Sequence, residues 1–333
     1  MNSTVFLAYD PVLKRDVAVK EITKSRFGND FDSYCEEART MFDAADPNIV
    51  GIEFVCETAD CIALALPYFQ NGSLHKKIEL NPLGLLEFMK LTQAVASGLA
   101  RIHICKFLHL DLKPTNVLLD DFWQPLITDF GQCRRMSPAG IVTYPQVYKF
   151  SMPPEMLNSH TATVESDIYQ FGLLLYRAAN GNLIYELQKA MVNSDGKLLQ
   201  RIEKGRFPDR NFFLPHIPGR VRTIVRKALN IDPKKRYRSA FEIAKVMGRV
   251  QLSLDWQTIS TNNGGYVWRA KRSGRDDLEV KLILDSPKRW KTEVWIASPQ
   301  RYRRKNVSGD WKRSLNYKEA MKHLTEVFVR LGQ

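Results

Sequence analysis

His109-Leu110-Asp111-Leu112-Lys113-Pro114-Thr115-Asn116 is the stretch that decides the fold, and Asp129-Phe130-Gly131 follows thirteen positions after Asn116. Together the two stretches supply two carboxylates, a lysine and an amide in a fixed order. Transfer of a phosphoryl group needs groups that hold phosphates and a divalent cation, and a carboxylate that orients the acceptor hydroxyl. The two stretches therefore predict a site for phosphoryl transfer.

The residues before this stretch have the pattern of a small β-rich lobe. Two alternating runs are joined at the turn-forming Asp10-Pro11, and the second run contains Val17-Ala18-Val19-Lys20, a strand with one charge at its end. A segment with helical spacing and two further strand-like runs follow. The predicted elements are strands at 3–9, 16–22, 49–56 and 61–69 and a helix at 31–45.

From residue 83 onward the apolar spacing changes to that of helices. Apolar residues recur every three or four positions over about twenty residues, at Leu85, Phe88, Leu91, Val95, Leu99 and Ile102. Four later segments have similar spacing, at 166–179, 184–192, 218–229 and 239–250. The sequence thus predicts a second lobe that is mainly helical.

With Lys20 in its strand, these motifs match the protein-kinase signature set, and the chain resembles the bacterial members of the eukaryotic-like, or Hanks-type, Ser/Thr protein kinase family. The resemblance covers about residues 2–248. It implies an α+β, bilobal kinase fold with a small lobe at 1–69 and a helical lobe at 70–250. The appended α+β domain predicted at 251–333 lies outside the resemblance. The resemblance also implies ATP and Mg²⁺ as cofactors and a Ser/Thr hydroxyl of a protein substrate as acceptor.

The resemblance assigns roles to the charged residues. Asp111 is similar to the catalytic base that accepts the hydroxyl proton, and Lys113 to the lysine that steadies the transferring phosphoryl group. Asn116 and Asp129 resemble the Mg²⁺ ligands, and Lys20 the lysine that holds the α- and β-phosphates. The ion-pair partner of Lys20 is expected to be Glu37, with the neighbouring Glu36 as the alternative.

The adenine site implied by the resemblance lies where the run 61–69 ends. Leu66 occupies the gatekeeper position, and the Pro67 carbonyl and the Phe69 N–H would contact the base; proline is compatible because only its carbonyl is used. Ala18 and Leu118 would enclose the ring, although either could be an ordinary core residue.

Three further residues resemble structural positions of the family. Glu155, in Pro153-Pro154-Glu155, is similar to a glutamate that pairs with an arginine, here Arg236. Asp167 resembles a buried aspartate that braces the catalytic loop from a hydrophobic helix, so its mutation should cost folding as much as activity.

The chain departs from the family pattern at three places. Val5 fits the last valine of the glycine-rich loop, but Ser3 stands where the third glycine would be; either the first strand is absent or the natural product starts upstream, and weaker ATP binding is expected. Leu110 replaces an arginine that reads a phosphorylated loop, so loop phosphorylation should matter less. Tyr148 stands where Ser/Thr kinases usually carry threonine, while Lys113 still favours Ser/Thr as acceptor.

Residues 251–333 differ in composition from the rest and predict a separate domain. They carry 17 Lys and Arg against 9 Asp and Glu and hold five of the six tryptophans. Strands are predicted at 265–272, 278–285 and 291–303 and a helix at 316–331. We recognise no family in this domain.

Basic residues alternate with aromatic ones in this domain, and two interpretations remain open. The aromatics could stack on nucleic-acid bases while the cations follow phosphates, or alternation could place the tryptophans in a small core; core is favoured for Trp268 and Trp295. The cluster 301–305 is the better candidate for an acidic partner or nucleic acid.

No apolar window reaches about 18 residues and no signal peptide is evident, so the sequence predicts a cytoplasmic protein without membrane contact. The five cysteines are expected to be reduced and mostly buried. The competing interpretation is a pseudokinase or adaptor whose function lies in the basic C-terminal domain.

Overall fold

The computed structural model describes residues 4–12, 14–24, 45–143, 149–193, 196–298, 303–306 and 310–332, with only the backbone described at 193, 297–298 and 303–306. Contacts divide the chain into two compact units. The first comprises Met1–Lys76, Leu91–Leu174 and Ala228–Ala244, and the second comprises Lys77–Lys90, Leu175–Lys227 and Lys245–Gln333. Each unit is therefore assembled from several separate segments of the chain.

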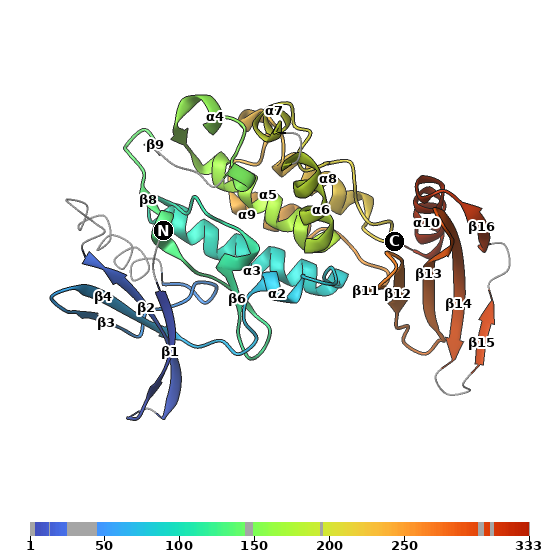
Figure 1. Ribbon diagram of the computed structural model, residues 1–333, viewed down its shortest axis with the longest axis horizontal. Coiled ribbons are helices and arrows are strands. Elements are labelled where there is room, and N and C mark those ends of the chain that lie inside the picture. Colours follow the sequence, from blue (N-terminus) through green and yellow to red (C-terminus); the bar gives the residue numbers. More distant parts are fainter. Residues whose placement is uncertain are drawn as a thin grey trace. The chain divides into compact units, whose positions relative to one another are not determined.

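The first unit begins with a four-stranded antiparallel sheet in the order β1-β2-β4-β3 (Figure 1). Register places Ala18 of β2 opposite Leu66 of β4, and Lys20 opposite Leu64. The predicted run at 49–56 forms a strand only near its end, while Ile49 makes a parallel bridge with Ile127. The strands are β1 Thr4–Asp10, β2 Arg15–Thr23, β3 Phe54–Glu57 and β4 Cys61–Pro67.

The rest of the first unit consists of helices and short strand pairs that carry the motif residues. The predicted long helix from residue 83 and the helix at 166–179 are both present, as α3 and α5. The elements are α2 Leu74–Lys77, α3 Leu85–Ile104, β5 Phe107–Leu108, η2 Pro114–Asn116, β6 Val117–Leu119, β7 Pro125–Ile127, η3 Phe130–Gln132, β8 Arg134–Arg135, β9 Val142–Thr143, η4 Lys149–Ser151, α4 Met156–Ser159, β10 Thr161–Ala162, α5 Val164–Asn180, η5 Pro233–Lys235 and α9 Ala240–Met247. α3 and α5 extend into the second unit.

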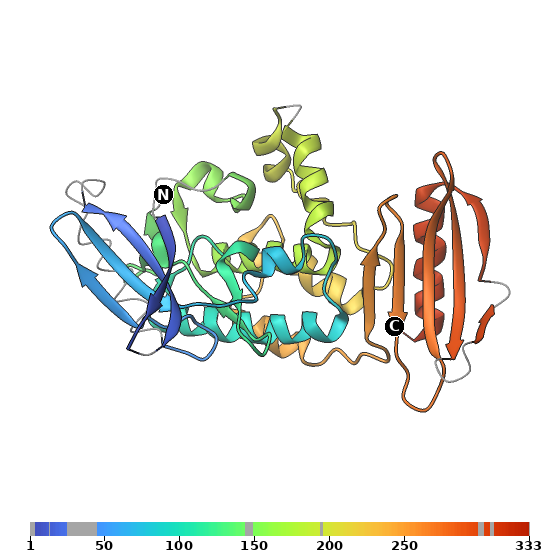
Figure 2. The same ribbon diagram turned by 60° about the horizontal axis from the view of Figure 1, so that its bottom comes forward.

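The second unit contains three helices, a sheet and a closing helix. The helices α6 Asn182–Asn193, α7 Leu198–Glu203 and α8 Gly219–Ala228 precede the sheet. The sheet strands are β11 Trp256–Ser260, β12 Tyr266–Ala270, β13 Asp277–Ser286, β14 Arg289–Ser298, β15 Arg303–Asn306 and β16 Lys312–Leu315. Helix α10 (Tyr317–Leu331) lies along this sheet in both views (Figures 1 and 2).

The prediction of three strands after residue 250 was incomplete, because the antiparallel sheet has six. Its order is β11-β12-β13-β14-β15, with β16 also paired to β14. The missed strands are short, and two of them, Arg-Arg-Lys-Asn in β15 and Lys-Arg-Ser-Leu in β16, lack the apolar alternation that identifies a half-buried strand. Their pairing with β14 forms them in spite of this composition.

The core of this sheet is aromatic, and one of its members comes from outside residues 251–333. Trp256, Trp268 and Phe328 are fully buried, and each tryptophan makes an edge contact with the Phe328 ring of α10. The His216 ring, from the loop before α8, lies 6.0 Å from the Trp268 ring and accepts a hydrogen bond at Nδ1 from Trp268 Nε1–H (2.9 Å). The core position predicted for Trp268 is confirmed, whereas Trp295 is only half-buried and makes an edge contact with the Trp311 ring.

Two other predictions can be compared with the structure. Among the described cysteines only Cys133 is buried, so the prediction that most are buried was wrong; Cys56 is exposed and Cys61 and Cys105 are half-buried. Within the described residues, no helix is both long enough and apolar enough to span a membrane.

Candidate active site

Lys20 and Asp129 meet at the centre of the site although they are 109 residues apart in sequence. Lys20 is buried on β2, and its Nζ donates to Oδ1 of Asp129 at 3.0 Å. Asp129 follows β7 with a left-handed backbone, at φ 62° and ψ 75°. A non-glycine residue in this conformation stores strain that its surroundings must hold, and such residues cluster at functional sites.

The charge state of Asp129 follows from these surroundings. Burial by itself would raise the pKa of the carboxyl, but the ion pair and hydrogen bond with Lys20, helped by the charge of Lys113, hold its pKa below the usual value of 3.8. Asp129 is therefore a carboxylate throughout the neutral range. An ionised oxygen of this kind suits a hard divalent cation.

Asp111, Lys113 and Asn116 form a second polar group on the loop after β5. Lys113 Nζ donates to Asp111 Oδ2 at 2.7 Å, and Asn116 Nδ2 donates to the same oxygen at 3.0 Å. Asn116 Nδ2 also donates to the backbone oxygen of Asp111 at 2.9 Å. The orientation of the Asp111 carboxylate is thus set by one cation and one amide.

Helix α5 holds the backbone of this loop through two residues one turn apart. Asp167 is completely buried, and its oxygens accept from the N–H groups of His109 and Leu110, both at 2.8 Å. Gln170 Oε1 accepts from the Leu112 N–H, while Gln170 Nε2 donates to the Leu110 carbonyl. Asp167 therefore lies where the sequence placed it, whereas the role of Gln170 was missed.

His109 was also missed as a functional residue. Its Nε2 lies 3.3 Å from the Thr128 carbonyl, and its Nδ1 accepts from the Asp111 N–H at 3.3 Å. Since a carbonyl can only accept, the bond to Thr128 requires the proton on Nε2, which leaves Nδ1 free to accept. The ring also packs against Phe130 at 5.4 Å, so His109 joins the Asp111 loop to the Asp129 segment.

A cavity of about 250 Å³ lies beside these groups. It is lined by eight of the residues predicted from the sequence, which are Val5, Ala18, Lys20, Leu66, Pro67, Leu118, Asn116 and Asp129. Leu64, Thr115 and Thr128 also line it and were not predicted. The strand register explains the grouping, because Val5 pairs with Lys20 and Ala18 pairs with Leu66.

The lining fits a nucleotide and a divalent cation. Aliphatic side chains supply flat, apolar walls at one part of the cavity, and Lys20, Asn116 and Asp129 supply charge and oxygen ligands at another. Within the described residues no group of three His, Cys, Asp or Glu side chains could hold a metal by itself. Carboxylate and amide oxygens from two residues match Mg²⁺, which usually completes its shell with water and phosphate oxygens.

The remaining predicted positions are Phe69, which does not line the cavity, and several residues that the structure does not describe. The Phe69 carbonyl accepts from the Gly72 N–H at 3.0 Å, so this residue begins a tight turn after β4. Glu37 and its alternative Glu36 lie outside the described residues, as do Tyr148 and the side chains of 301–305.

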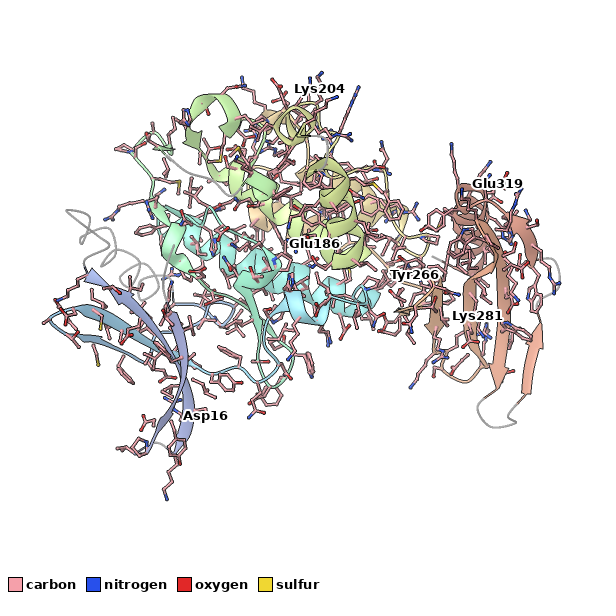
Figure 3. All side chains as sticks on the ribbon, in the orientation of Figure 1. Asp16, Glu186, Lys204, Tyr266, Lys281 and Glu319 are labelled. Carbon is pink, nitrogen blue, oxygen red and sulfur yellow. The ribbon has the colours of Figure 1, made fainter. Side chains whose placement is uncertain are left out.

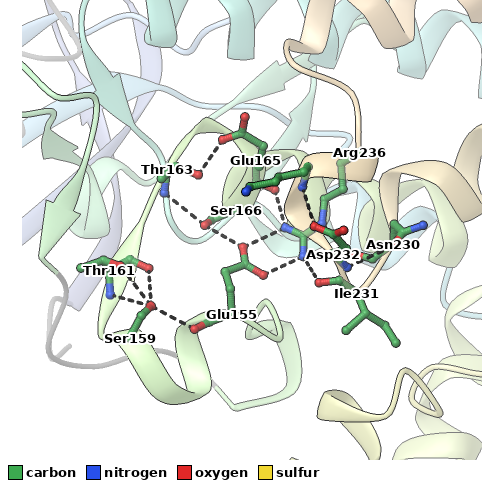
Figure 4. Close-up of polar contacts among 11 residues, drawn as sticks. Glu155, Ser159, Thr161, Thr163, Glu165, Ser166, Asn230, Ile231, Asp232 and Arg236 are labelled. Carbon is green, nitrogen blue, oxygen red and sulfur yellow. Dashed lines mark hydrogen bonds and ion pairs between the residues drawn. The ribbon is translucent and has the colours of Figure 1, made fainter.

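The predicted pair of Glu155 and Arg236 is bidentate (Figure 4). Arg236 Nη1 and Nη2 donate to the two oxygens of Glu155 at 2.8 and 2.6 Å. The guanidinium also donates to the carbonyls of Glu165 and Asn230 and lies over the Tyr169 ring. One arginine thereby ties the segment that ends at Glu155 to α5 and to the loop before η5.

Leu110, at the position where many kinases carry arginine, is buried in an aliphatic cluster. The cluster consists of Leu108, Leu110, Val142, Met156 and Ala162, with Met136, Met152 and Val164 packed against it. Several members come from the segment between Asp129 and Glu155. Apolar packing therefore holds Met136, Val142 and Met152 of this segment against the loop that carries Asp111.

Comparison with known proteins gives a family for most of the chain. The model of the protein kinase domain matches residues 1–246. The chain is 30% identical over 244 residues to the serine/threonine-protein kinase PrkC of Bacillus subtilis (strain 168), an alignment that covers 72% of this chain and 37% of the relative.

Two further relatives are similar over comparable lengths. The serine/threonine-protein kinase PknD of Chlamydia caviae is 27% identical over 292 residues, covering 76% of this chain and 30% of PknD. The probable serine/threonine-protein kinase PknB of Lactococcus lactis is 28% identical over 235 residues, covering 69% of this chain and 36% of PknB. The chain thus spans about a third of the length of these relatives.

Proposed function

The chain belongs to the protein kinase domain family, and on that premise we propose that it transfers the γ-phosphoryl group of ATP to Ser or Thr hydroxyls of a protein substrate. The observation that carries the proposal is the convergence of Lys20, Asn116 and Asp129 at one cavity with aliphatic walls, with Asp111 hydrogen-bonded to Asn116 beside it. Residues from β2, the loop after β5, η2 and the end of β7 contribute to this arrangement. It provides the positioning and the charge that phosphoryl transfer requires.

We propose that Asp111 accepts the proton of the acceptor hydroxyl. Its Oδ2 is engaged by Lys113 and Asn116, which fixes the carboxylate plane and directs the other oxygen toward the acceptor. Lys113 Nζ, 2.7 Å from Asp111, would place a positive charge beside the oxygens of the phosphoryl group as it transfers.

Lys20, Asn116 and Asp129 would hold the phosphate end of the nucleotide. We propose Asn116 and Asp129 as ligands of Mg²⁺, which neutralises phosphate charge when it is bound. Lys20 would bind the α- and β-phosphates, and its position 3.0 Å from Asp129 would keep both charges in the same cavity. The Pro67 carbonyl and the Phe69 N–H remain our proposed adenine contacts, between Ala18, Leu66 and Leu118. Glu37 remains the proposed partner of Lys20.

We propose that the segment between Asp129 and Glu155 is held by apolar packing and not by a phosphate. The support is the burial of Leu110 with Val142 and Met156. A phosphorylated loop is usually read by arginine, and leucine offers no donor for a phosphate. Activity should therefore not require phosphorylation of this segment.

For the C-terminal domain, residues 251–333, we propose partner binding, with an acidic partner or nucleic acid at 301–305 as the working hypothesis. Ion pairs on the neighbouring strands weaken the case that nucleic acid binds along them. Arg269 and Lys281 both pair with Glu279, and Lys291 pairs with Glu293 (Figure 3 labels Lys281). Cations engaged in this way contribute less to phosphate binding.

The test of the proposed activity is incorporation of γ-³²P from Mg·ATP into the purified chain and into a cell lysate. Asp111→Asn and Asp129→Asn should each lower labelling by at least about 100-fold, since each removes a charge used in positioning or proton transfer. Asp16→Asn is the matched control, because Asp16 is exposed on β2 and does not line the cavity (Figure 3 labels Asp16). The Asp16→Asn variant should incorporate as much γ-³²P as the parent chain does.

The outcomes separate the proposal from its competitor. Labelling that survives both site variants would come from a contaminating kinase. If the folded parent neither labels a protein nor binds ATP, the kinase assignment fails and the chain is an adaptor. Activity that disappears when Mg²⁺ is removed and returns when it is added would support the proposed metal.

A further inference from the structure

Residues 197–227 carry a dense excess of positive charge that the proposed activity does not use. The segment has nine Lys and Arg against two Asp and Glu. It lies entirely in the second unit and includes α7 and α8. On α8 the residues Arg220, Thr223, Arg226 and Lys227 are exposed, and their spacing places them on one face of the helix.

Several of these cations are held in place by the backbone around them. Arg210 Nη2 donates to the Gly205 carbonyl at 2.7 Å. Arg226 Nε donates to the Arg210 carbonyl at 3.0 Å, and its guanidinium lies over the Phe213 ring. The charges are therefore positioned before any partner arrives, which lowers the entropy cost of binding.

Helix α6 joins this region and exposes an apolar stripe. Leu183, Leu187 and Met191 are 49%, 50% and 69% exposed, and they recur every four residues on one face of α6. Tyr185 and Val192 anchor the opposite face. The Asp209 N–H, next to Arg210, donates to Gln188 of α6 at 2.8 Å, so α6 is bonded to the same loop as α8.

Helix α7 extends the apolar surface beside the charge. Leu199 is 45% exposed on α7, and the exposed Lys204 follows the end of the same helix, at the outer edge of the chain in Figure 3. A surface helix normally exposes polar side chains, so exposed aliphatic residues on two helices that contact each other mark an interaction surface. Aliphatic side chains every four residues match the anchors by which an amphipathic helix is recognised.

We propose that α6, α7 and α8 form a docking surface for an acidic amphipathic segment of a partner protein. The partner's apolar side chains would pack on Leu183, Leu187, Met191 and Leu199, and its carboxylates would face the cations of 197–227. Charge complementarity identifies the partner as acidic. Nucleic acid is the weaker fit, since sites for single strands rely on aromatic rings for stacking and this stripe is aliphatic. The docking surface does not depend on phosphoryl transfer.

The test is a titration of a fluorescein-labelled helical peptide, made of Leu and Glu in an amphipathic arrangement, with the full chain. Fluorescence anisotropy gives the Kd. Leu187→Glu should raise the Kd by about tenfold or more, because it puts a charge in an apolar contact that faces an acidic peptide. Lys204→Glu should raise it by about threefold or more and weaken its dependence on salt.

Two exposed residues of α10 supply matched controls in the same unit. Val329→Glu and Lys318→Glu make the same chemical changes outside the proposed surface and should leave the Kd within about twofold. Circular dichroism and thermal melting of every variant show that it is folded. Because all four substituted side chains are exposed, folding should be retained.

Four results would overturn the proposal. The first is that the peptide shows no saturable binding, and the second is that an isomer with its leucines dispersed around the helix binds equally well. The third is that surface and control variants change the Kd equally. The fourth is that oligo(dT) or anionic vesicles bind more tightly through the same residues. The last result would assign the surface to nucleic acid or to lipid. Failure of the γ-³²P assay would leave this measurement unaffected.

Discussion

Asp167 uses both carboxylate oxygens to hold the loop that carries Asp111. It accepts from two backbone N–H groups and also lies 2.8 Å from His103 Nε2. Burial would raise the pKa of this carboxyl, but the hydrogen bond and charge of His103 and the hydrogen bond from the Leu110 N–H together hold its pKa below 3.8. The residue thus links a buried ionised group to the geometry of the site.

Asp167→Asn should lower the free energy of unfolding by about 3–5 kcal/mol, because an amide cannot replace both accepting oxygens in a buried site. The pKa of Asp167 is depressed, so its contribution is complete above pH 3.8 and is lost as the pH falls below that value. Urea unfolding of the parent and of Asp167→Asn at several pH values measures this difference in the free energy of unfolding. Asp121→Asn, at an exposed position, is the control and should change stability by less than about 0.5 kcal/mol.

Leu110 is a single residue that decides how the neighbouring segment is held. Leu110→Arg should lower the free energy of unfolding by at least about 3 kcal/mol, because it buries an unpaired guanidinium among aliphatic side chains. Leu110→Met should cost less than about 1.5 kcal/mol, since it keeps the volume and the apolar character. Thermal unfolding compares the two; a tolerated arginine would mean that the cluster opens to solvent.

At the scale of elements, α5 does more than fill the core. Its buried face presents Asp167 and Gln170 to the loop before η2, and Gln170 Nε2 also reaches the Ser151 carbonyl at 3.4 Å. Arg236 then connects Glu155, next to α4, with the backbone at the start of α5. The position of the segment between Asp129 and Glu155 thus depends on one helix and one arginine.

Arg236→Lys should destabilise the chain by at least about 2 kcal/mol, although the charge is kept, because lysine cannot form the two-pronged bond to Glu155 or bond the backbone carbonyls at the same time. Arg238→Lys is the matched control two residues away at an exposed position. Denaturant titration of both variants measures the difference. Equal stability of the two variants would show that charge alone matters.

At the scale of the whole molecule, the core of residues 251–333 includes a residue from outside them. His216 lies in the loop before α8, yet it is fully buried among Trp268, Phe328 and Thr258 of the sheet and α10. Asn81 accepts from the Ser260 N–H, and Asp255 accepts from the Leu86 N–H, so further residues from before position 250 bond the start of the sheet. The second unit is consequently built from both sides of the boundary predicted near residue 250.

Stability of the second unit should depend on pH through His216. Burial lowers the pKa of His216 to about 3, whereas the unfolded ring titrates near 6.5, so stability is full above pH 6.5 and falls by about 1.4 kcal/mol per pH unit as the pH drops from 6.5 toward 3. His216→Phe should be less stable at pH 7, because Trp268 Nε1 loses its acceptor. Its stability should, however, lack the fall between pH 6.5 and pH 3 that the His216 ring causes. Thermal unfolding from pH 7 to pH 4 compares the slopes; equal slopes would contradict the buried neutral ring.

The sequence by itself determined the family and the α+β class, because the order and spacing of its motifs match those of protein kinases. The resemblance to that family then identified most of the residues that line the cavity. Lys20, Asp111, Asn116 and Asp129 could be identified because each has a fixed neighbour or spacing. The tertiary structure alone placed His109 and Gln170 at the site and His216 in a core more than forty residues away. Hydrogen bonds from a helix to a distant loop have no sequence period, so Gln170 looks like any polar residue in α5. The strands β15 and β16 could not be predicted for a related reason. Their own composition does not favour a strand, and they form because they pair with β14.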